Sequence, residues 1–133
     1  MTEIQALLLL KASLESSDLH GVESLLAEDC VYVSTGRGTI ARNKIESIEF
    51  LSAMTDSIKV DRVPVICRVM HIAEVYKDDA LFREGRVGLT VAYDEGDAYA
   101  YMLFVDLNDD GRIERIVSSQ ENYTIEYDDL RLS

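Results

Sequence analysis

The sequence predicts a single α+β domain in which three helices pack on one face of a curved antiparallel sheet. The expected order is helix, helix, strand, helix and then four strands. Residues 2–58 carry apolar side chains mostly at helical spacings of three and four, whereas the later residues alternate with period two. Short runs rich in Asp, Asn and Gly separate the alternating segments, and the 133 residues contain no linker-like or repetitive stretch. Helices followed by a run of strands are typical of α+β domains.

Two helices and one strand are expected first. The helix over residues 2–16 is apolar nearly all round, which indicates burial on more than one side. Asp18 is a candidate N-cap for a short second helix that ends before residue 30. The apolar face of that helix consists of Val22, Leu25 and Leu26. Residues 30–34 then switch to a β-branched and aromatic strand, and two glycines predict a loop over residues 35–39.

A third helix and four strands complete the predicted domain. The helix is expected over residues 42–57, because Ile45, Ile48 and Leu51 begin an apolar stripe. Turns of hairpin length separate the strands, which predicts an antiparallel meander. Ile125 and Tyr127 can extend the last strand. The four strands are expected over residues 63–75, 81–93, 98–106 and 113–123.

Charge and cysteine content limit the classes of partner and the compartment. The chain has 25 acidic and 13 basic residues, a net charge of −12, which repels phosphate backbones and anionic membranes. We therefore expect no nucleic-acid partner and no membrane partner. The apolar run over residues 6–10 lacks the basic flank of a secretory signal and the length of a membrane span, so we expect a cytoplasmic protein. Cys30 and Cys67 are expected to be small buried hydrophobic residues in a reducing compartment.

Three segments resemble the nuclear transport factor 2-like superfamily, which includes ketosteroid isomerase and SnoaL-like polyketide cyclases. They are residues 18–34, the helix from Arg42 that contains Phe50-Leu51, and the hairpin over residues 104–113. The resemblance covers about residues 3–127. It implies a cone-shaped fold that encloses an apolar pocket, and a homodimer formed through the outer face of the sheet.

Two reactions of this superfamily are not expected here. Ketosteroid isomerases use an aspartate base at the end of the first strand, and the match through residues 18–34 places Ser34 at that position. Serine cannot abstract a proton from carbon without its own activating base. Leu10 and Leu103 fall at or beside the two positions that donate hydrogen bonds to the oxyanion. Limonene-epoxide-hydrolase relatives need an Arg-x-Asp on a strand, and this sequence contains none.

Four polar residues are the candidates for ligand binding: Tyr32, Ser34, Tyr101 and Gln120. Tyr32 and Ser34 share the strand face on which pocket residues of the superfamily lie, although Tyr32 can equally be a core aromatic residue whose hydroxyl reaches a partner at the rim. Tyr101 belongs to an alternating aromatic stretch that lines either the pocket or a dimer interface. Gln120 shares one face of the last strand with Ser118, and the sequence leaves open whether that face looks inward.

His71 is the candidate for acid–base catalysis, because it interrupts an apolar alternating strand and a histidine side chain can serve as acid or base near neutral pH. The alternative is a histidine that is satisfied in the core or at an interface.

No metal and no cofactor are expected. Residues 106–117 match the first half of a calcium-binding EF-hand loop, but Val117 occupies the position that requires a bidentate glutamate. We interpret this segment as an Asx/Gly hairpin turn. The two histidines and two cysteines lie too far apart in the sequence to indicate a zinc site.

The leading functional interpretation is a homodimeric, cofactor-free domain that binds a small, mainly apolar molecule in its pocket. The first alternative is a cyclase, isomerase or dehydratase that uses His71 as a proton shuttle. The second is a non-catalytic interaction module whose interior is filled by its own side chains.

Overall fold

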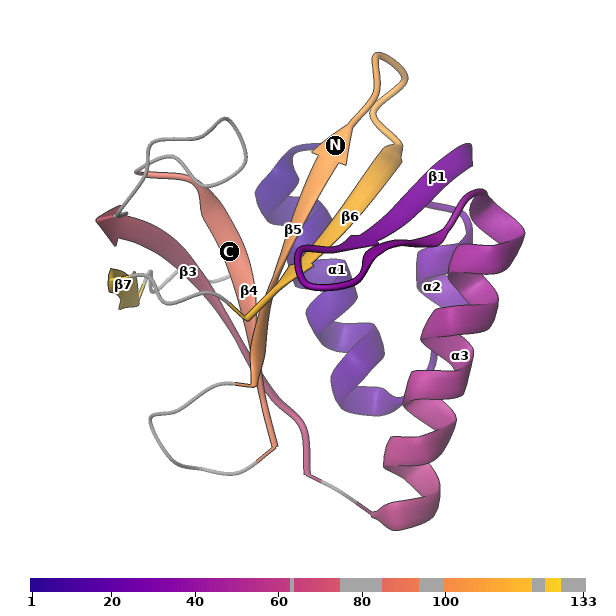
Figure 1. Cartoon of the computed structure of the whole chain (residues 1–133), viewed down its shortest axis with the longest axis horizontal. Coiled ribbons are helices and arrows are strands. Elements are labelled where there is room, and N and C mark those ends of the chain that lie inside the picture. The colour runs from indigo at the N-terminus through magenta and orange to yellow at the C-terminus, as the bar shows by residue number, and fades with distance from the viewer. Residues whose placement is uncertain (63, 75–84, 94–99, 121–123, 128–133) are drawn as a thin grey trace.

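The computed structural model describes residues 1–62, 64–74, 85–93, 100–120 and 124–127, which form three helices and a seven-stranded sheet (Figure 1). The helices are α1 (Glu3–Ser16), α2 (His20–Glu23) and α3 (Lys44–Asp61). The strands are β1 (Leu26–Ser34), β2 (Gly38–Ala41), β3 (Ile66–Glu74), β4 (Val87–Ala92), β5 (Tyr101–Leu107), β6 (Ile113–Ser119) and β7 (Thr124–Tyr127).

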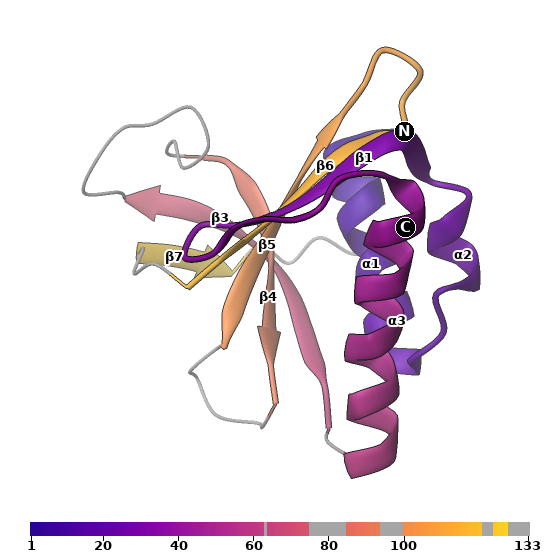
Figure 2. The same ribbon diagram turned by 45° about the vertical axis from the view of Figure 1, so that its right-hand side comes forward.

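The strands follow the order β2-β1-β6-β5-β4-β3-β7, and the curved sheet turns one face toward the helices (Figure 2). The predicted α+β class is confirmed. One strand pair departs from the expected antiparallel pattern, because β1 and β6 are parallel. No tight turn joins these two strands, so the direction of their pairing is not imposed by a hairpin.

The boundary between α2 and β1 lies earlier than predicted. We expected a helix that includes Leu26 and a strand from residue 30, but α2 ends at Glu23 and β1 begins at Leu26. Leu26 pairs with Ile113 of β6, whose N–H donates to the carbonyl of Leu25 at 2.8 Å. Pairing with the sheet therefore replaces the last helical turn. Asp18 accepts a hydrogen bond from the His20 N–H at 3.0 Å, although the cap position itself is Leu19.

Two short strands form that were not predicted as separate elements. Residues 38–41 were expected to lie in or just after a loop, but they pair with β1 as β2, with Ser34 opposite Gly38 and Tyr32 opposite Ala41. Residues 124–127 do not extend β6. They form β7, which pairs with β3 at the far edge of the sheet. Both pairings depend on where distant strands lie, which local sequence patterns do not specify.

Capping residues set the ends of the two long helices. Thr2 and Gln5 form a reciprocal capping box before α1, and the Asn43 side chain accepts from the Glu46 N–H before α3. The third helix continues to Asp61, beyond the predicted end at residue 57, and stops at Arg62 in the left-handed region with φ of 53°. The predicted strand ends at residues 63, 75, 81–84, 98–99 and 121–123 lie outside the described residues.

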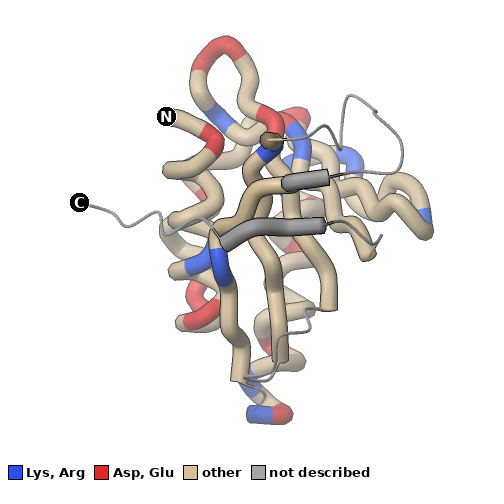
Figure 3. Tube along the Cα trace, turned by 90° about the vertical axis from the view of Figure 1, so that its left-hand side faces the viewer, with Lys and Arg blue, Asp and Glu red and all other residues tan. Residues whose placement is uncertain are grey.

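The core lies between the helices and the facing side of the sheet. Leu7, Leu10 and Leu14 of α1 are at most 1% exposed and pack against the sheet. Cys30 and Cys67 are buried free thiols in this core, as predicted. Figure 3 shows few charged residues along the strands. It also shows acidic residues at the tip of the β5–β6 turn.

The β5–β6 turn is the predicted Asx turn. Asn108 Oδ1 accepts hydrogen bonds from the N–H groups of Asp110 and Arg112, and Gly111 supplies a φ of 77°. Among the described residues, no three His, Cys, Asp or Glu side chains gather where they could hold a metal ion. Within the same part of the chain, none of the helices combines the length and apolar character needed to cross a membrane.

Candidate ligand-binding site

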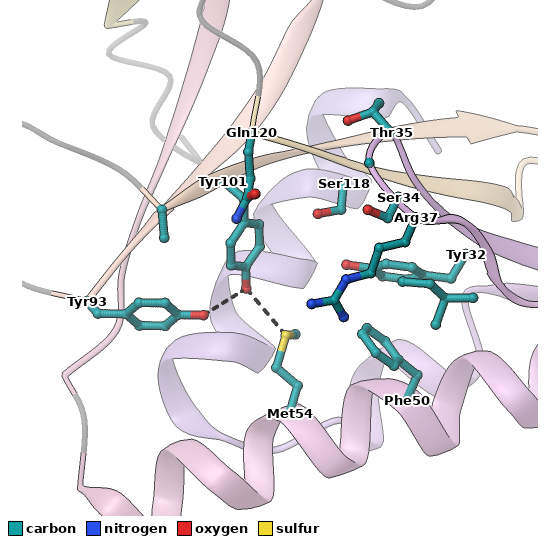
Figure 4. Close-up of a pocket in the computed structure, with 13 residues that line it drawn as sticks. Tyr32, Ser34, Thr35, Arg37, Phe50, Met54, Tyr93, Tyr101, Ser118 and Gln120 are labelled. Carbon is teal, nitrogen blue, oxygen red and sulfur yellow. Dashed lines mark hydrogen bonds between the residues drawn. The ribbon is translucent and has the colours of Figure 1, made fainter.

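A cavity of about 810 Å³ opens between the β1–β2 turn, α3 and the ends of β4, β5 and β6 (Figure 4). Its apolar and aromatic wall consists of Tyr32, Ile40, Phe50, Met54, Tyr93, Ala100 and Tyr101. Its remaining described lining residues are Ser34, Thr35, Gly36, Arg37, Ser118 and Gln120. Cavities of this size that combine apolar and aromatic side chains with convergent polar groups are typical of small-molecule sites.

Strand alternation and register bring the β1 and β6 residues together. Tyr32 and Ser34 are two residues apart on β1, so their side chains share one face. In the parallel β1–β6 pair, Ser34 lies opposite Ser118, which places Ser118 beside it at the cavity. The Tyr32 ring is only 2% exposed and packs against Phe50 of α3, with ring centroids 4.7 Å apart.

A chain of hydrogen bonds crosses the opposite side of the cavity. The Tyr93 hydroxyl donates to the Tyr101 hydroxyl oxygen at 3.3 Å, and the Tyr101 hydroxyl donates to Met54 Sδ at 3.4 Å. A thioether sulfur is a weak acceptor, so the Tyr101 proton has a poor partner within the protein. A ligand oxygen in the cavity would be a stronger acceptor for the same proton.

Both buried tyrosines remain neutral donors at physiological pH. Burial raises the pKa of Tyr32 to about 12, and a hydrogen bond with Ser118 opposes part of the shift. Burial also raises the pKa of Tyr101, and its hydrogen bond with Tyr93 acts in the same direction. These groups can therefore donate hydrogen bonds to a ligand carbonyl, but they are poor bases.

The β1–β2 turn carries Arg37 into the site. The Arg37 N–H donates to the Ser34 carbonyl, and the Thr35 N–H donates to the Ser118 carbonyl at 3.0 Å, which ties the turn to β6. Gly38, with φ of 82°, then returns the chain into β2. Figure 4 shows the Arg37 guanidinium reaching into the cavity, between the side chains of Tyr32 and Met54 in this view.

The structure brings all four predicted ligand-binding residues to this one cavity. All four line the cavity: Tyr32, Ser34, Tyr101 and Gln120. Ser118 lines it as well, so the strand face that carries Ser118 and Gln120 is the one that looks inward. Ser119 lies on the other face of that strand and is buried. Their role in binding a ligand remains a prediction.

His71 does not line the cavity. It lies on β3, opposite Val87 of β4 and Glu126 of β7. The proton-shuttle role considered as an alternative for His71 therefore has no geometric basis in this cavity. The described lining residues also include no Asp or Glu. Leu10 and Leu103, which the resemblance placed at or beside the donor positions of ketosteroid isomerases, are fully buried in the core.

The sequence interpretation missed Arg37, Phe50, Met54 and Tyr93 as site residues. A signal for Arg37 was present, because it follows the strand that carries Tyr32 and Ser34 and lies between two glycines. The pairing of β2 with β1 places Arg37 at the cavity, and the sequence did not predict that pairing. The inward face of α3 depends on how the helix packs, and the sequence alone does not specify that orientation.

Comparison with solved structures shows which fold this is. An NTF2-like protein of unknown function from Cytophaga hutchinsonii superposes with a TM-score of 0.52 at 15% identity, over 90% of this chain and 98% of that one. A putative isomerase of the SnoaL-like family from Agrobacterium tumefaciens superposes with a TM-score of 0.55 at 18% identity, over 90% and 97% of the two chains. This chain has the nuclear transport factor 2-like fold.

An LEH-like epoxide hydrolase from M. tuberculosis has the same architecture, with a TM-score of 0.55 at 19% identity over 92% of this chain and 82% of that one. These identities establish the nuclear transport factor 2-like fold alone. No family model matches the sequence, and no curated protein matches it. A fold of this kind does not specify an activity, which depends on the residues of the cavity.

Proposed function

We propose that this nuclear transport factor 2-like domain binds a small, mainly apolar molecule in its cavity. Tyr32, Ser34, Tyr101 and Gln120 serve as the polar contacts. The observation that carries the proposal is the convergence of two neutral tyrosine hydroxyls on one cavity of about 810 Å³, whose wall combines apolar and aromatic side chains with polar ones. Such a cavity accepts an apolar body and fixes its orientation through carbonyl or hydroxyl oxygens.

The open cavity weighs against an interaction module with a filled interior. In that module, side chains such as Phe50 and Met54 would occupy the space that they line here. The Tyr101 hydroxyl would also have a stronger acceptor than a sulfur atom, because buried donors in a closed core are normally well satisfied.

A cyclase-, isomerase- or dehydratase-type enzyme is the second candidate. The observation that favours it is the Tyr93–Tyr101 pair, whose chained hydroxyls can stabilise an oxygen that gains negative charge during reaction. Such an enzyme also needs a base, and the described lining residues contain neither a carboxylate nor His71. Binding is therefore the function that the described groups support best.

The test is a thermal-shift screen with neutral aromatic ketones and amides, including 2-naphthamide. A ligand that binds only the native state raises its melting temperature. The variant Ala100→Trp places an indole at an exposed lining position and should abolish the shift. The matched control is Ala53→Trp, an equally exposed alanine on α3 outside the lining residues. The proposal is contradicted if no compound raises the melting temperature, or if both variants retain the wild-type shift.

A further inference from the structure

One feature of the cavity is not explained by a mainly apolar ligand. Arg37 is the single charged residue among the described residues that line it. The ion pairs of the described chain involve Lys11, Lys44, Arg86 and Arg115, and none involves Arg37. Other basic side chains of the described chain, Arg42 and Arg112 among them, also have no ion pair there, so Arg37 is distinguished by its position at the cavity.

A bound ligand would change the surroundings of this guanidinium. Arg37 is exposed to solvent, so water satisfies its five donors when the cavity is open. A neutral, apolar ligand would displace that water without replacing its hydrogen bonds, which disfavours binding. An anionic group on the ligand would replace the water with charge-assisted hydrogen bonds. The position of Arg37 therefore selects for ligands that present negative charge at the β1–β2 turn.

The geometry favours a carboxylate. A guanidinium is a planar fork that matches the two oxygens of a carboxylate. The Tyr32 hydroxyl and the Ser34 side chain lie beside Arg37 at the same end of the cavity, where they can donate to the same oxygens (Figure 4). Phe50 and Met54 form the apolar surface next to it. An amphipathic carboxylic acid would place its acid group at the turn and its apolar body against α3.

The net charge of the chain does not oppose this arrangement. At physiological ionic strength, charges are screened over roughly 8 Å, so exposed carboxylates elsewhere on the chain act weakly on a ligand inside the cavity. The adjacent guanidinium acts at contact distance and therefore dominates.

We propose that Arg37 makes the cavity selective for a small apolar molecule that carries a carboxylate. This inference rests on the proposed ligand-binding function and specifies its ligand class. Arg37 acts here as a specificity-determining residue and is assigned no part in a reaction.

The test compares two probes of nearly identical shape, 2-naphthoate and 2-naphthamide, which differ in charge at neutral pH. Isothermal titration calorimetry gives the ratio of their affinities for each protein. For the wild type we expect the carboxylate to bind about tenfold more tightly, the effect of a charge-assisted hydrogen bond at a partly exposed site. Arg37→Gln should reduce the ratio to about one, and Arg37→Lys, which keeps the charge without the fork, should give an intermediate value.

The matched control is Arg112→Gln, which makes the same charge change at an exposed position in the β5–β6 turn, outside the lining residues. It should keep the wild-type ratio. Equal affinities of the two probes for the wild type, or a ratio that Arg37→Gln leaves intact, would overturn the carboxylate inference while ligand binding stands. If neither probe binds the wild type, this inference fails, and the thermal-shift screen with the other compounds decides the ligand-binding proposal separately.

Discussion

Tyr32 and Tyr101 are the buried tyrosines of the cavity wall, and their hydroxyls have different hydrogen-bond partners. Tyr32 packs against Phe50, and its hydroxyl has a hydrogen bond with the Ser118 hydroxyl. Tyr101 receives a hydrogen bond from Tyr93 and gives its own proton to the Met54 sulfur. Because sulfur accepts weakly, a ligand oxygen can take over this proton at little cost to the protein. We therefore assign Tyr101 the larger part in polar recognition.

Tyr101→Phe should weaken the binding of 2-naphthamide about fivefold, because a hydrogen bond from a buried donor contributes on the order of 1 kcal/mol. Tyr93→Phe leaves the Tyr101 donor in place and should have a smaller effect. Calorimetric titration of both variants measures the difference. Wild-type affinity in Tyr101→Phe would show that the ligand does not use this hydroxyl.

The Tyr32 hydroxyl should make stability fall at alkaline pH. Its pKa is about 12 in the folded chain, against 10.0 for the unperturbed group. Between these values the unfolded state loses the proton and the native state retains it, so the free energy of unfolding decreases as pH rises. The full loss is about 3 kcal/mol for this shift. Urea unfolding across that pH range should show a shallower decline for Tyr32→Phe than for the wild type, and equal slopes would contradict the assignment.

At the scale of elements, the close pairing of β4 with β5 depends on a glycine. Gly88 lies opposite Met70 of β3, and a Cβ atom built at this position would lie 2.5 Å from Met102 Cε and 2.8 Å from Phe104 Cε1. Met102 and Phe104 are both fully buried on β5, so they have little room to move. The close approach of these strands keeps Val91 and Tyr101 paired at the cavity.

Gly88→Ala should therefore lower the free energy of unfolding by about 2 kcal/mol through overpacking. Gly21→Ala is the matched control, because a Cβ at that position meets nothing within 4 Å. It should be neutral or slightly stabilising. Urea denaturation followed by circular dichroism compares the two, and similar stabilities would contradict the close packing.

At the scale of the whole molecule, local patterns predicted the class of the fold and part of the site. The alternation of side chains between the two faces of a strand was sufficient to place Tyr32 and Ser34 on one face of β1. The inward face of β6 was not predictable, because it depends on the parallel register that sets Ser34 opposite Ser118. Arg37 was missed for a related reason, since its position requires the pairing of β2 with β1. Pairing between distant segments is set by the assembled sheet, and local propensity does not encode it.

We also propose that the chain forms a homodimer, as the resemblance to nuclear transport factor 2-like proteins led us to expect. Light scattering at micromolar concentration should then give twice the 15.0 kDa mass of one chain. A mass near that of one chain would contradict the dimer and would leave the cavity proposals unaffected, because all their residues come from one chain.

The central claim is that a small molecule binds in the cavity lined by Tyr32, Tyr93 and Tyr101. The most direct measurement is a titration of protein with isotopically labelled tyrosine rings, followed by nuclear magnetic resonance, with 2-naphthamide as the probe. The chain contains seven tyrosines, so the ring signals can be assigned by single Tyr→Phe variants. We predict saturable shifts that are largest at these three rings. Shifts that spare all three, or no shifts at all, would contradict the account.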